Sequence, residues 1–168
     1  MSDVADPSAI RMALTASGFA FELLENRVRL KSAADGAAYW GISLGSTAPA
    51  LVLRAADRFL LLILSGAGGK VDFQALAHRT GEKGLRMATP GEIRDRFRLG
   101  PGEVPLFGLD LPTFVDRRLL AHDHVYGGSG IPELTLKIAP GALLVLNRES
   151  RLIDVPGLTD ENGREEIA

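Results

Sequence analysis

Two runs of consecutive apolar residues lie close together in the chain, at Ala50–Leu53 and at Phe59–Leu64. A strand with one face in water alternates apolar and polar residues, whereas a strand buried on both faces is apolar throughout. The polar segment Arg54–Arg58 separates the runs and is short enough for a hairpin connection. We therefore predict a hairpin of buried strands at the centre of a sheet.

Capping residues and apolar periodicity predict the remaining elements. Helices are expected from Asp6 to about Ser17, from Ser32 to Gly41, from Val71 to Thr80, and from Thr89 to about Arg98. Short strands are expected at Phe19–Leu24, Thr113–Val115, His124–Tyr126 and Leu134–Ile138, with a last helix after Pro140. Interleaved helices and strands of this kind indicate one mixed α/β domain.

Composition restricts the class of function. The chain has 168 residues, a net charge of -2 and no cysteine. Without thiols it has no disulfides, thiolate zinc sites or cysteine nucleophiles, and without a basic excess any contact with RNA must come from a local patch. The N-terminal segment lacks the pattern of a signal peptide and the longest apolar run is too short for a membrane span, so a cytoplasmic domain is expected.

Two glycine-rich segments resemble catalytic loops without fitting them. Gly66–Lys70 would need glycine in place of Leu64 to form a phosphate-binding loop. Gly127–Gly130 would need glycine in place of Ile131 to form the turn of a serine nucleophile. Turns that connect strands account for both segments better.

Two further groups of residues give only weak indications of a catalytic triad and of a metal site. Asp116, His124 and Ser129 form a conceivable hydrolytic triad, but a triad is defined by geometry that closeness in sequence does not supply. His122 and His124 would point to the same side of a strand and could form half of a metal site. No third ligand is evident in the sequence, so no metal is expected.

Seven segments of the chain, taken in order, match the pattern of a known family. They are Ser32–Ile42 followed by Leu51–Arg54, then Val71–Leu76, Leu85–Ile93, Gly100–Leu109, Val115–Leu120 and Val125–Gly130. None is specific alone, but together they resemble the YbaK/prolyl-tRNA-synthetase-associated domain family over roughly residues 7 to 147.

The resemblance implies a compact mixed α/β fold with a partly closed, barrel-like sheet flanked by helices. Residues 1–155 would form this domain and residues 156–168 a polar tail. It also implies a groove for the 3′ end of mischarged tRNA, hydrolysis of the aminoacyl ester without a cofactor, and an aminoacyl-tRNA synthetase as a possible second partner. The amino acid that would be removed cannot be read from the sequence.

The resemblance places the catalytic site on Gly127, Gly128, Ser129 and Gly130, whose backbone amides would stabilise the developing oxyanion. Pro49 stands where the family has a lysine, and we expect it across the main pocket from the glycine loop. Proline supplies neither a charge nor a backbone donor. The implied function is therefore a divergent aminoacyl-tRNA deacylase or, alternatively, a catalytically silent module that binds the tRNA end, a synthetase or a small ligand.

Substrate-binding residues complete the expected site. The candidates are Lys31, Lys70, Lys83, Arg86 and Asp116. Lys70, Lys83 and Arg86 lie in or near loops that flank the family's groove and could contact phosphates. Lys31 precedes the second helix and is, alternatively, a cation that could reach the site in place of the missing lysine.

Overall fold

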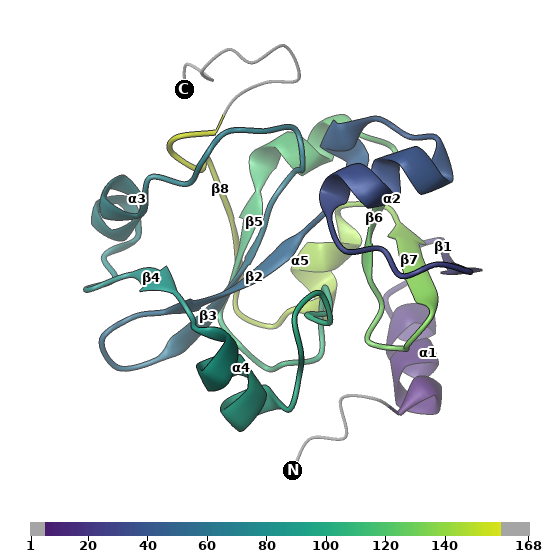
Figure 1. Cartoon of the computed structure of the whole chain (residues 1–168), viewed down its shortest axis with the longest axis horizontal. Helices are drawn as coiled ribbons and strands as arrows, with labels where there is room; N and C mark the ends of the chain where they lie inside the picture. Colours follow the sequence, from purple (N-terminus) through teal and green to yellow (C-terminus); the bar gives the residue numbers. More distant parts are fainter. Residues whose placement is uncertain (1–5, 159–168) are drawn as a thin grey trace.

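The computed structural model describes residues 6–158, which form two β-sheets flanked by helices (Figure 1). The five-stranded sheet has the strand order β4-β2-β3-β5-β8 and the three-stranded sheet the order β1-β7-β6. The strands are β1 (Phe21–Glu25), β2 (Ala50–Arg54), β3 (Phe59–Ile63), β4 (Arg86–Met87), β5 (Thr113–Asp116), β6 (Val125–Gly128), β7 (Leu134–Ile138) and β8 (Ser150–Ile153). The α-helices are α1 (Pro7–Ala16), α2 (Ala33–Trp40), α3 (Phe73–Thr80), α4 (Pro90–Phe97) and α5 (Ala142–Leu146), and short 3-10 helices cover Leu44–Ser46 and Arg117–Ala121.

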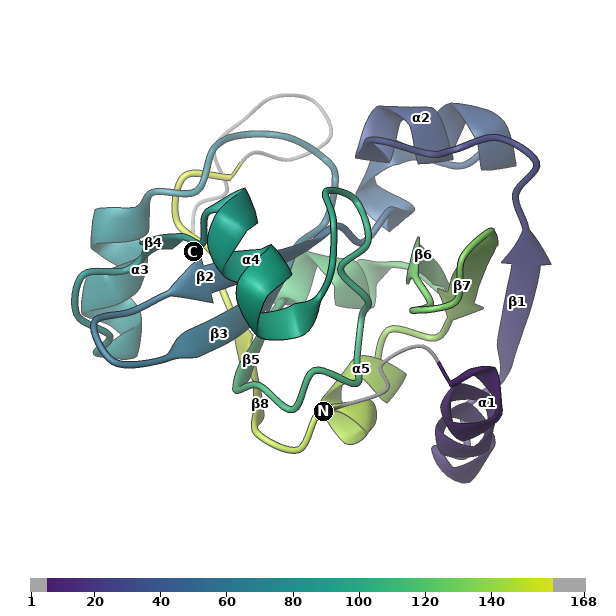
Figure 2. The ribbon, with the colours of Figure 1, turned by 60° about the horizontal axis from the view of Figure 1, so that its bottom comes forward.

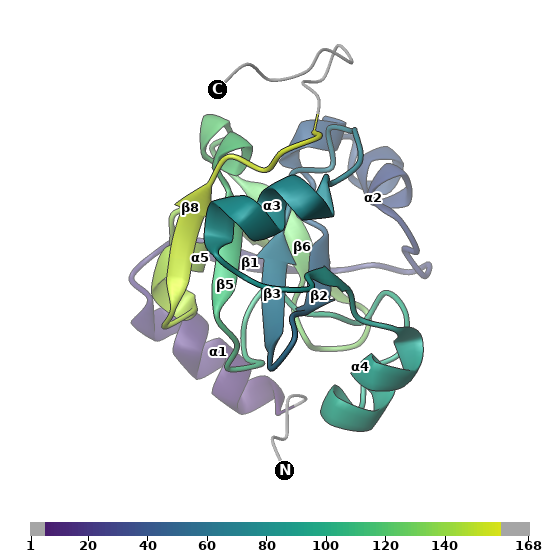
Figure 3. The ribbon, with the colours of Figure 1, turned by 90° about the vertical axis from the view of Figure 1, so that its left-hand side faces the viewer.

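The hairpin of β2 and β3 lies inside the larger sheet, as predicted from the two apolar runs. On one face, Leu60 and Leu62 pack in a cluster with Leu76 of α3. On the other face, Leu61 and Ile63 belong to the larger core, which extends to the three-stranded sheet. Figure 3 shows α3 lying across the first of these faces. Burial on both faces explains why neither strand alternates with polar residues.

The two sheets meet at one backbone contact between the segment before β2 and β6. Thr47 and Tyr126 form a parallel bridge, and the Ala48 N–H donates to the Tyr126 carbonyl at 2.7 Å. The sheets are otherwise separate and do not close into a barrel. The predicted mixed α/β fold is confirmed, and its partly closed sheet takes the form of two sheets joined at this contact.

The predicted helix ends are confirmed where capping chemistry defined them. Asp6 and Ser32 accept hydrogen bonds at the starts of α1 and α2, and Thr89 forms a reciprocal capping box with Glu92 at the start of α4. Helix α4 ends at Arg98, which has a φ of 60°. This is the left-handed conformation that glycine adopts most readily.

The structure corrects the C-terminal part of the prediction. Strand β8 has no counterpart among the predicted strands, and it pairs in parallel with β5. In the expected polar tail, Leu158 is 5% exposed and packs in the cluster that contains Leu76. The rest of that tail, residues 159–168, lies outside the described residues. Within residues 6–158, no helix is long and apolar enough to cross a membrane.

Candidate functional site

Pro49 and the glycines of β6 lie close together. The chain enters β2 beside β6, because Ala48 donates to Tyr126, the residue immediately before Gly127. The Pro49 carbonyl accepts the N–H of Leu64 at 2.9 Å on the hairpin side. The structure thus brings together the two parts of the site that the resemblance implies.

Gly127 and Gly128 do not form an open loop, because they are the last two residues of β6. A Cβ added to Gly127 would lie 2.8 Å from the Ala48 carbonyl oxygen, and one added to Gly128 would lie 2.6 Å from the Val104 carbonyl oxygen. The Gly128 carbonyl accepts the N–H of Leu106 at 3.0 Å. The two glycines therefore allow three chain segments to approach each other closely, and the loop interpretation is corrected for these positions.

Ser129 is a structural residue of the turn between β6 and β7. It is 2% exposed, and its hydroxyl oxygen lies 2.6 Å from the Leu134 carbonyl and 3.1 Å from the Ile131 carbonyl. The same oxygen accepts the N–H of Ile131 at 3.0 Å. Gly130 completes the turn with a φ of 85°. A hydroxyl that is buried and bonded in this way is not available as a nucleophile, so the triad hypothesis is wrong.

Asp116 makes structural contacts, and its expected role in substrate binding stays a prediction. The residue is 1% exposed, and its carboxylate accepts the N–H groups of Ser65 and Arg118, each at 2.9 Å. The guanidinium of Arg118 forms an ion pair with it at 2.9 Å. The carboxylate thus joins the end of β5 to the segment after β3.

Two hollows on the described surface are lined by residues other than Pro49 and Gly127–Gly130. One has a volume of about 310 Å³ and is lined by Asp110, Leu111, Pro112, Arg148 and Glu149. The other has a volume of about 560 Å³ and is lined by Val28, Arg29, Leu30, Lys31, Asp35, Ala38 and Tyr39. That the glycine loop lines the main pocket stays a prediction, since neither of these hollows includes it. We call the second cavity the α2 hollow.

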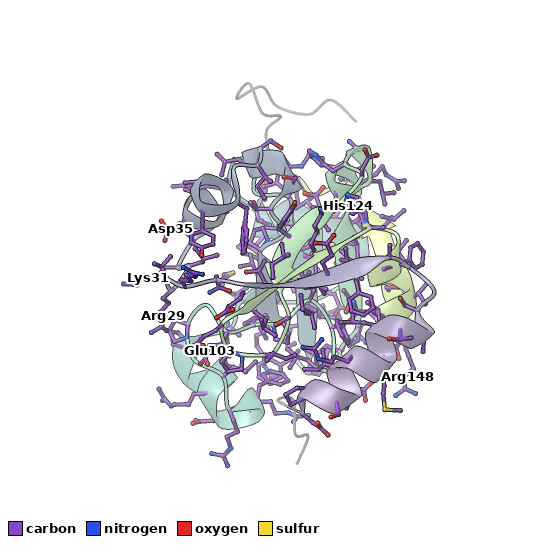
Figure 4. All side chains as sticks on the ribbon, turned by 90° about the vertical axis from the view of Figure 1, so that its right-hand side faces the viewer. Arg29, Lys31, Asp35, Glu103, His124 and Arg148 are labelled. Atoms are coloured by element: carbon purple, nitrogen blue, oxygen red, sulfur yellow. The ribbon has the colours of Figure 1, made fainter. Side chains whose placement is uncertain are left out.

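The α2 hollow combines cations, a carboxylate and an aromatic ring. Figure 4 shows Arg29, Lys31 and Asp35 along one side of the molecule. Asp35 Oδ2 accepts the Lys31 N–H at 3.1 Å, which leaves the other carboxylate oxygen without a hydrogen bond in the described part of the chain. The Tyr39 hydroxyl accepts the N–H of Arg27 at 3.0 Å. The sequence prediction included Lys31 but missed Arg29, Asp35 and Tyr39.

An aromatic cluster connects the α2 hollow with the glycines of β6. Tyr39 contacts Trp40 edge to face, with ring centroids 4.7 Å apart, and Trp40 stacks on Tyr126 at 6.5 Å. The Lys137 ammonium lies 5.9 Å from the Tyr126 ring centroid. The indole Nε1 of Trp40 is the only buried side-chain nitrogen or oxygen among the described residues that has no hydrogen-bond partner. The hollow and the implied site are therefore parts of one region.

The three cations expected to form a phosphate-binding patch are dispersed. Lys70 precedes α3 and Lys83 follows it, so the eight residues of α3, about 12 Å of helix, separate them. Arg86 lies in β4 and makes two hydrogen bonds to Glu92, at 2.7 and 3.2 Å. None of the three lines either hollow.

The structure does not bring metal ligands together within residues 6–158, where no group of three or more His, Cys, Asp or Glu residues could hold an ion. His122 and His124 both precede β6, which begins at Val125. The two histidines therefore do not lie on a strand, where alternating side chains would have placed both imidazoles on one side.

The fold and the α2 hollow define a small α/β domain with a cationic, aromatic-lined surface site. Residues 28–146 match the model of the aminoacyl-tRNA editing domain, and the chain belongs to this family. The crystal structure of a candidate trans-editing enzyme for prolyl tRNA synthetase is 28% identical, with a TM-score of 0.74 over 89% of this chain and 97% of that one. The crystal structure of hypothetical protein APE2540 has the same fold, with 23% identity and a TM-score of 0.77 over 87% and 97% of the two chains. None of the curated proteins compared with the chain matches it.

Proposed function

We propose that this domain hydrolyses the ester bond between a wrongly attached amino acid and the 3′ end of tRNA. Water attacks the carbonyl carbon of the ester, the carbon–oxygen bond to the terminal ribose breaks, and the ribose oxygen takes up a proton. The products are the free amino acid and uncharged tRNA. An aminoacyl ester is already activated, so a positioned water and stabilisation of the developing oxyanion suffice.

The observation that carries this proposal is the chemistry of the α2 hollow in a member of the editing family. Arg29 and Lys31 offer positive charge to the phosphates of a single-stranded RNA end, and Tyr39 offers a ring on which a base can stack. The volume of about 560 Å³ is within the range of sites for small molecules. A terminal nucleotide with its amino acid is a ligand of this size.

The α2 hollow also contains groups suited to the hydrolysis. The free carboxylate oxygen of Asp35 can accept a proton from the attacking water, and the ammonium of Lys31 can stabilise the negative charge that develops on the ester oxygen. Lys31 would then supply the cation that Pro49 does not. The amino acid removed would be determined by the contacts of its side chain near Trp40 and Tyr126.

A panel of tRNAs, each charged with a noncognate amino acid, tests the proposal when the release of free amino acid by the pure protein is followed. We expect release from at least one member of the panel. Lys31→Ala and Asp35→Asn should each reduce the rate about a hundredfold, the typical effect of removing one preorganised group. Arg11→Gln removes an exposed charge from α1, outside the hollow, and is the matched control. No release from any member, or full activity of both variants, would contradict the proposed mechanism.

The alternative function is a catalytically silent module that binds the tRNA end, a synthetase or a small ligand. The observation that favours it is Pro49, together with the occupied hydroxyl of Ser129 and the buried carboxylate of Asp116. In this case the uncharged tRNA end would bind without hydrolysis of any ester in the panel. Pro49→Lys separates the two functions, because a silent but otherwise competent site should gain deacylation when the family's cation is restored.

A further inference from the structure

Helix α4 lies beside the β2–β3 hairpin (Figure 2), and arginine and phenylalanine side chains of the two elements contact each other. The guanidinium of Arg54 lies 4.7 Å from the centroid of the Phe59 ring, and Phe59 contacts Phe97 edge to face at 5.5 Å. The guanidinium of Arg96 lies 5.4 Å from the centroid of Phe97. Cation–π contacts of this kind hold guanidinium groups in place and leave their N–H edges free to donate hydrogen bonds.

The cations around these contacts outnumber their acidic partners. Arg54 lies directly opposite Arg86 in the pairing of β2 with β4, and like charges in cross-strand positions repel each other. Glu92 is engaged by Arg86 and Asp95 by Arg94, whereas Arg54, Arg96 and Arg98 form no ion pair within the described residues. We call Arg54, Arg86, Arg94, Arg96 and Arg98 the α4 arginine surface. A bound polyanion would relieve the electrostatic repulsion among the guanidinium groups of these five arginines.

The α4 arginine surface is continuous with the α2 hollow. One guanidinium nitrogen of Arg29, which lines the hollow, lies 3.5 Å from the carbonyl of Pro101 in the loop that follows α4. Figure 4 shows Arg29 close to Glu103 of the same loop. The cations thus extend from the hollow, past this loop, to the C-terminal end of α4.

We propose that the α4 arginine surface binds the phosphate backbone of the tRNA acceptor stem while the 3′ end occupies the α2 hollow. The inference rests on the proposed function, because that function identifies the polyanion as RNA. The whole chain has a net charge of -2, so this local surface must supply the attraction. Arginine guanidinium groups match phosphate geometry in a bidentate manner, and those of Arg54 and Arg96 are held by the contacting rings of Phe59 and Phe97.

The test measures binding of an uncharged RNA hairpin with a single-stranded 3′ overhang, by fluorescence anisotropy at several salt concentrations. Arg54→Gln, Arg96→Gln and Arg98→Gln are combined in one variant. The control combines Arg11→Gln, Arg117→Gln and Arg148→Gln, which remove equal charge from exposed positions elsewhere. We expect the first variant to bind about thirtyfold or more weakly at 0.1 M salt and its salt slope to flatten by about 2 to 3, because each lost phosphate contact on a duplex contributes about 0.9. The control should retain most of the affinity.

An unchanged slope in the first variant, or equal losses in both variants, would overturn the proposal. Binding to acidic peptides that the RNA hairpin does not displace would overturn it in favour of a protein partner. If the triple variant fails to fold, Arg96→Gln combined with Arg98→Gln leaves the contact of Arg54 with Phe59 intact and should still flatten the slope by more than 1, since each lost duplex contact contributes about 0.9.

Binding and hydrolysis are measured separately, so that the two proposals can fail independently. Uncharged RNA reports on the α4 arginine surface even if no ester is hydrolysed. If the domain is active, the triple variant should raise KM for charged tRNA while kcat stays the same. The same variant should hydrolyse a short aminoacyl oligonucleotide, which lacks the stem, at the unchanged rate. Loss of activity on both substrates would contradict a role confined to the stem.

Discussion

Replacement of Gly127 by alanine tests whether the glycines of β6 serve chain packing or ligand access. The added Cβ would lie 2.8 Å from the Ala48 carbonyl oxygen and 2.8 Å from Cδ1 of Leu106. The Leu106 side chain can move, but Ala48 cannot shift without disturbing its 2.7 Å hydrogen bond to Tyr126, which joins the two sheets. Overpacking of this kind costs about 1–3 kcal/mol, and because backbone is involved we expect about 2 kcal/mol.

The assay is chemical unfolding in urea, followed by circular dichroism, with thermal unfolding as a second measurement. A loss of about 2 kcal/mol lowers Tm by about 4–8 °C in a chain of this size. Gly36→Ala is the matched control, because Gly36 lies inside α2 and an added Cβ there meets no atom within 4 Å. This control should gain about 0.5–1 kcal/mol from better helix propensity.

The structural interpretation of Gly127 is refuted if Gly127→Ala unfolds at the same urea concentration as the unmodified protein. If Gly127→Ala lost hydrolysis while its unfolding midpoint stayed the same, the glycine would be needed for the substrate to approach, as the resemblance implied. A lowered unfolding midpoint with hydrolysis retained below the transition would support packing instead.

Three further outcomes are expected. Asp116→Asn should destabilise the protein by about 3–5 kcal/mol in urea unfolding, because it removes the charge of a buried carboxylate that pairs with Arg118 and accepts the N–H of Ser65. The hydrogen bond from Arg86 lowers the pKa of Glu92 to about 2, so this carboxylate stabilises the fold above its ordinary pKa of 4.5 and loses that effect as the pH falls toward 2. Glu92→Gln should therefore flatten the fall of Tm over this pH range. Arg98→Gly should raise stability by up to about 1 kcal/mol in urea unfolding, because glycine adopts the left-handed conformation at the end of α4 without strain.

Local chemistry made most of the fold predictable from the sequence. The capping side chains of Asp6, Ser32 and Thr89 act within three residues of their own positions, so the helix starts could be read directly. The β2–β3 hairpin was predictable for the same reason, since its strands are adjacent in the chain. Strand β8 was missed because it is short and pairs in parallel with β5, whose residues precede it by more than thirty positions. Only tertiary structure specifies that pairing.

The candidate site was less predictable, because its residues meet through contacts distant in sequence. Trp40 stacks on Tyr126, a residue 86 positions later, and no spacing rule connects them. Asp35 was not predicted as a site residue because it lies in the first turn of α2, where an acidic residue is expected for capping alone. The glycines of β6 were identified by resemblance, but whether a glycine admits a ligand or a neighbouring chain segment depends on what lies opposite its missing Cβ.

Proline at position 49 is compatible with the fold because no hydrogen bond found there requires an N–H at that residue. The bond toward β6 is made by the N–H of Ala48, and the bond toward β3 is accepted by the Pro49 carbonyl. The family's lysine can therefore be lost without cost to the sheet, provided that its charge is unnecessary or is supplied elsewhere. Under the proposed function, Lys31 in the α2 hollow supplies that charge, so Lys31→Ala and Pro49→Lys test one function from two positions. If Pro49→Lys restores hydrolysis to a Lys31→Ala variant, the ester lies within reach of both positions. If Pro49→Lys does not restore hydrolysis, the two positions serve different substrates, and Lys31 does not replace the family's lysine at position 49.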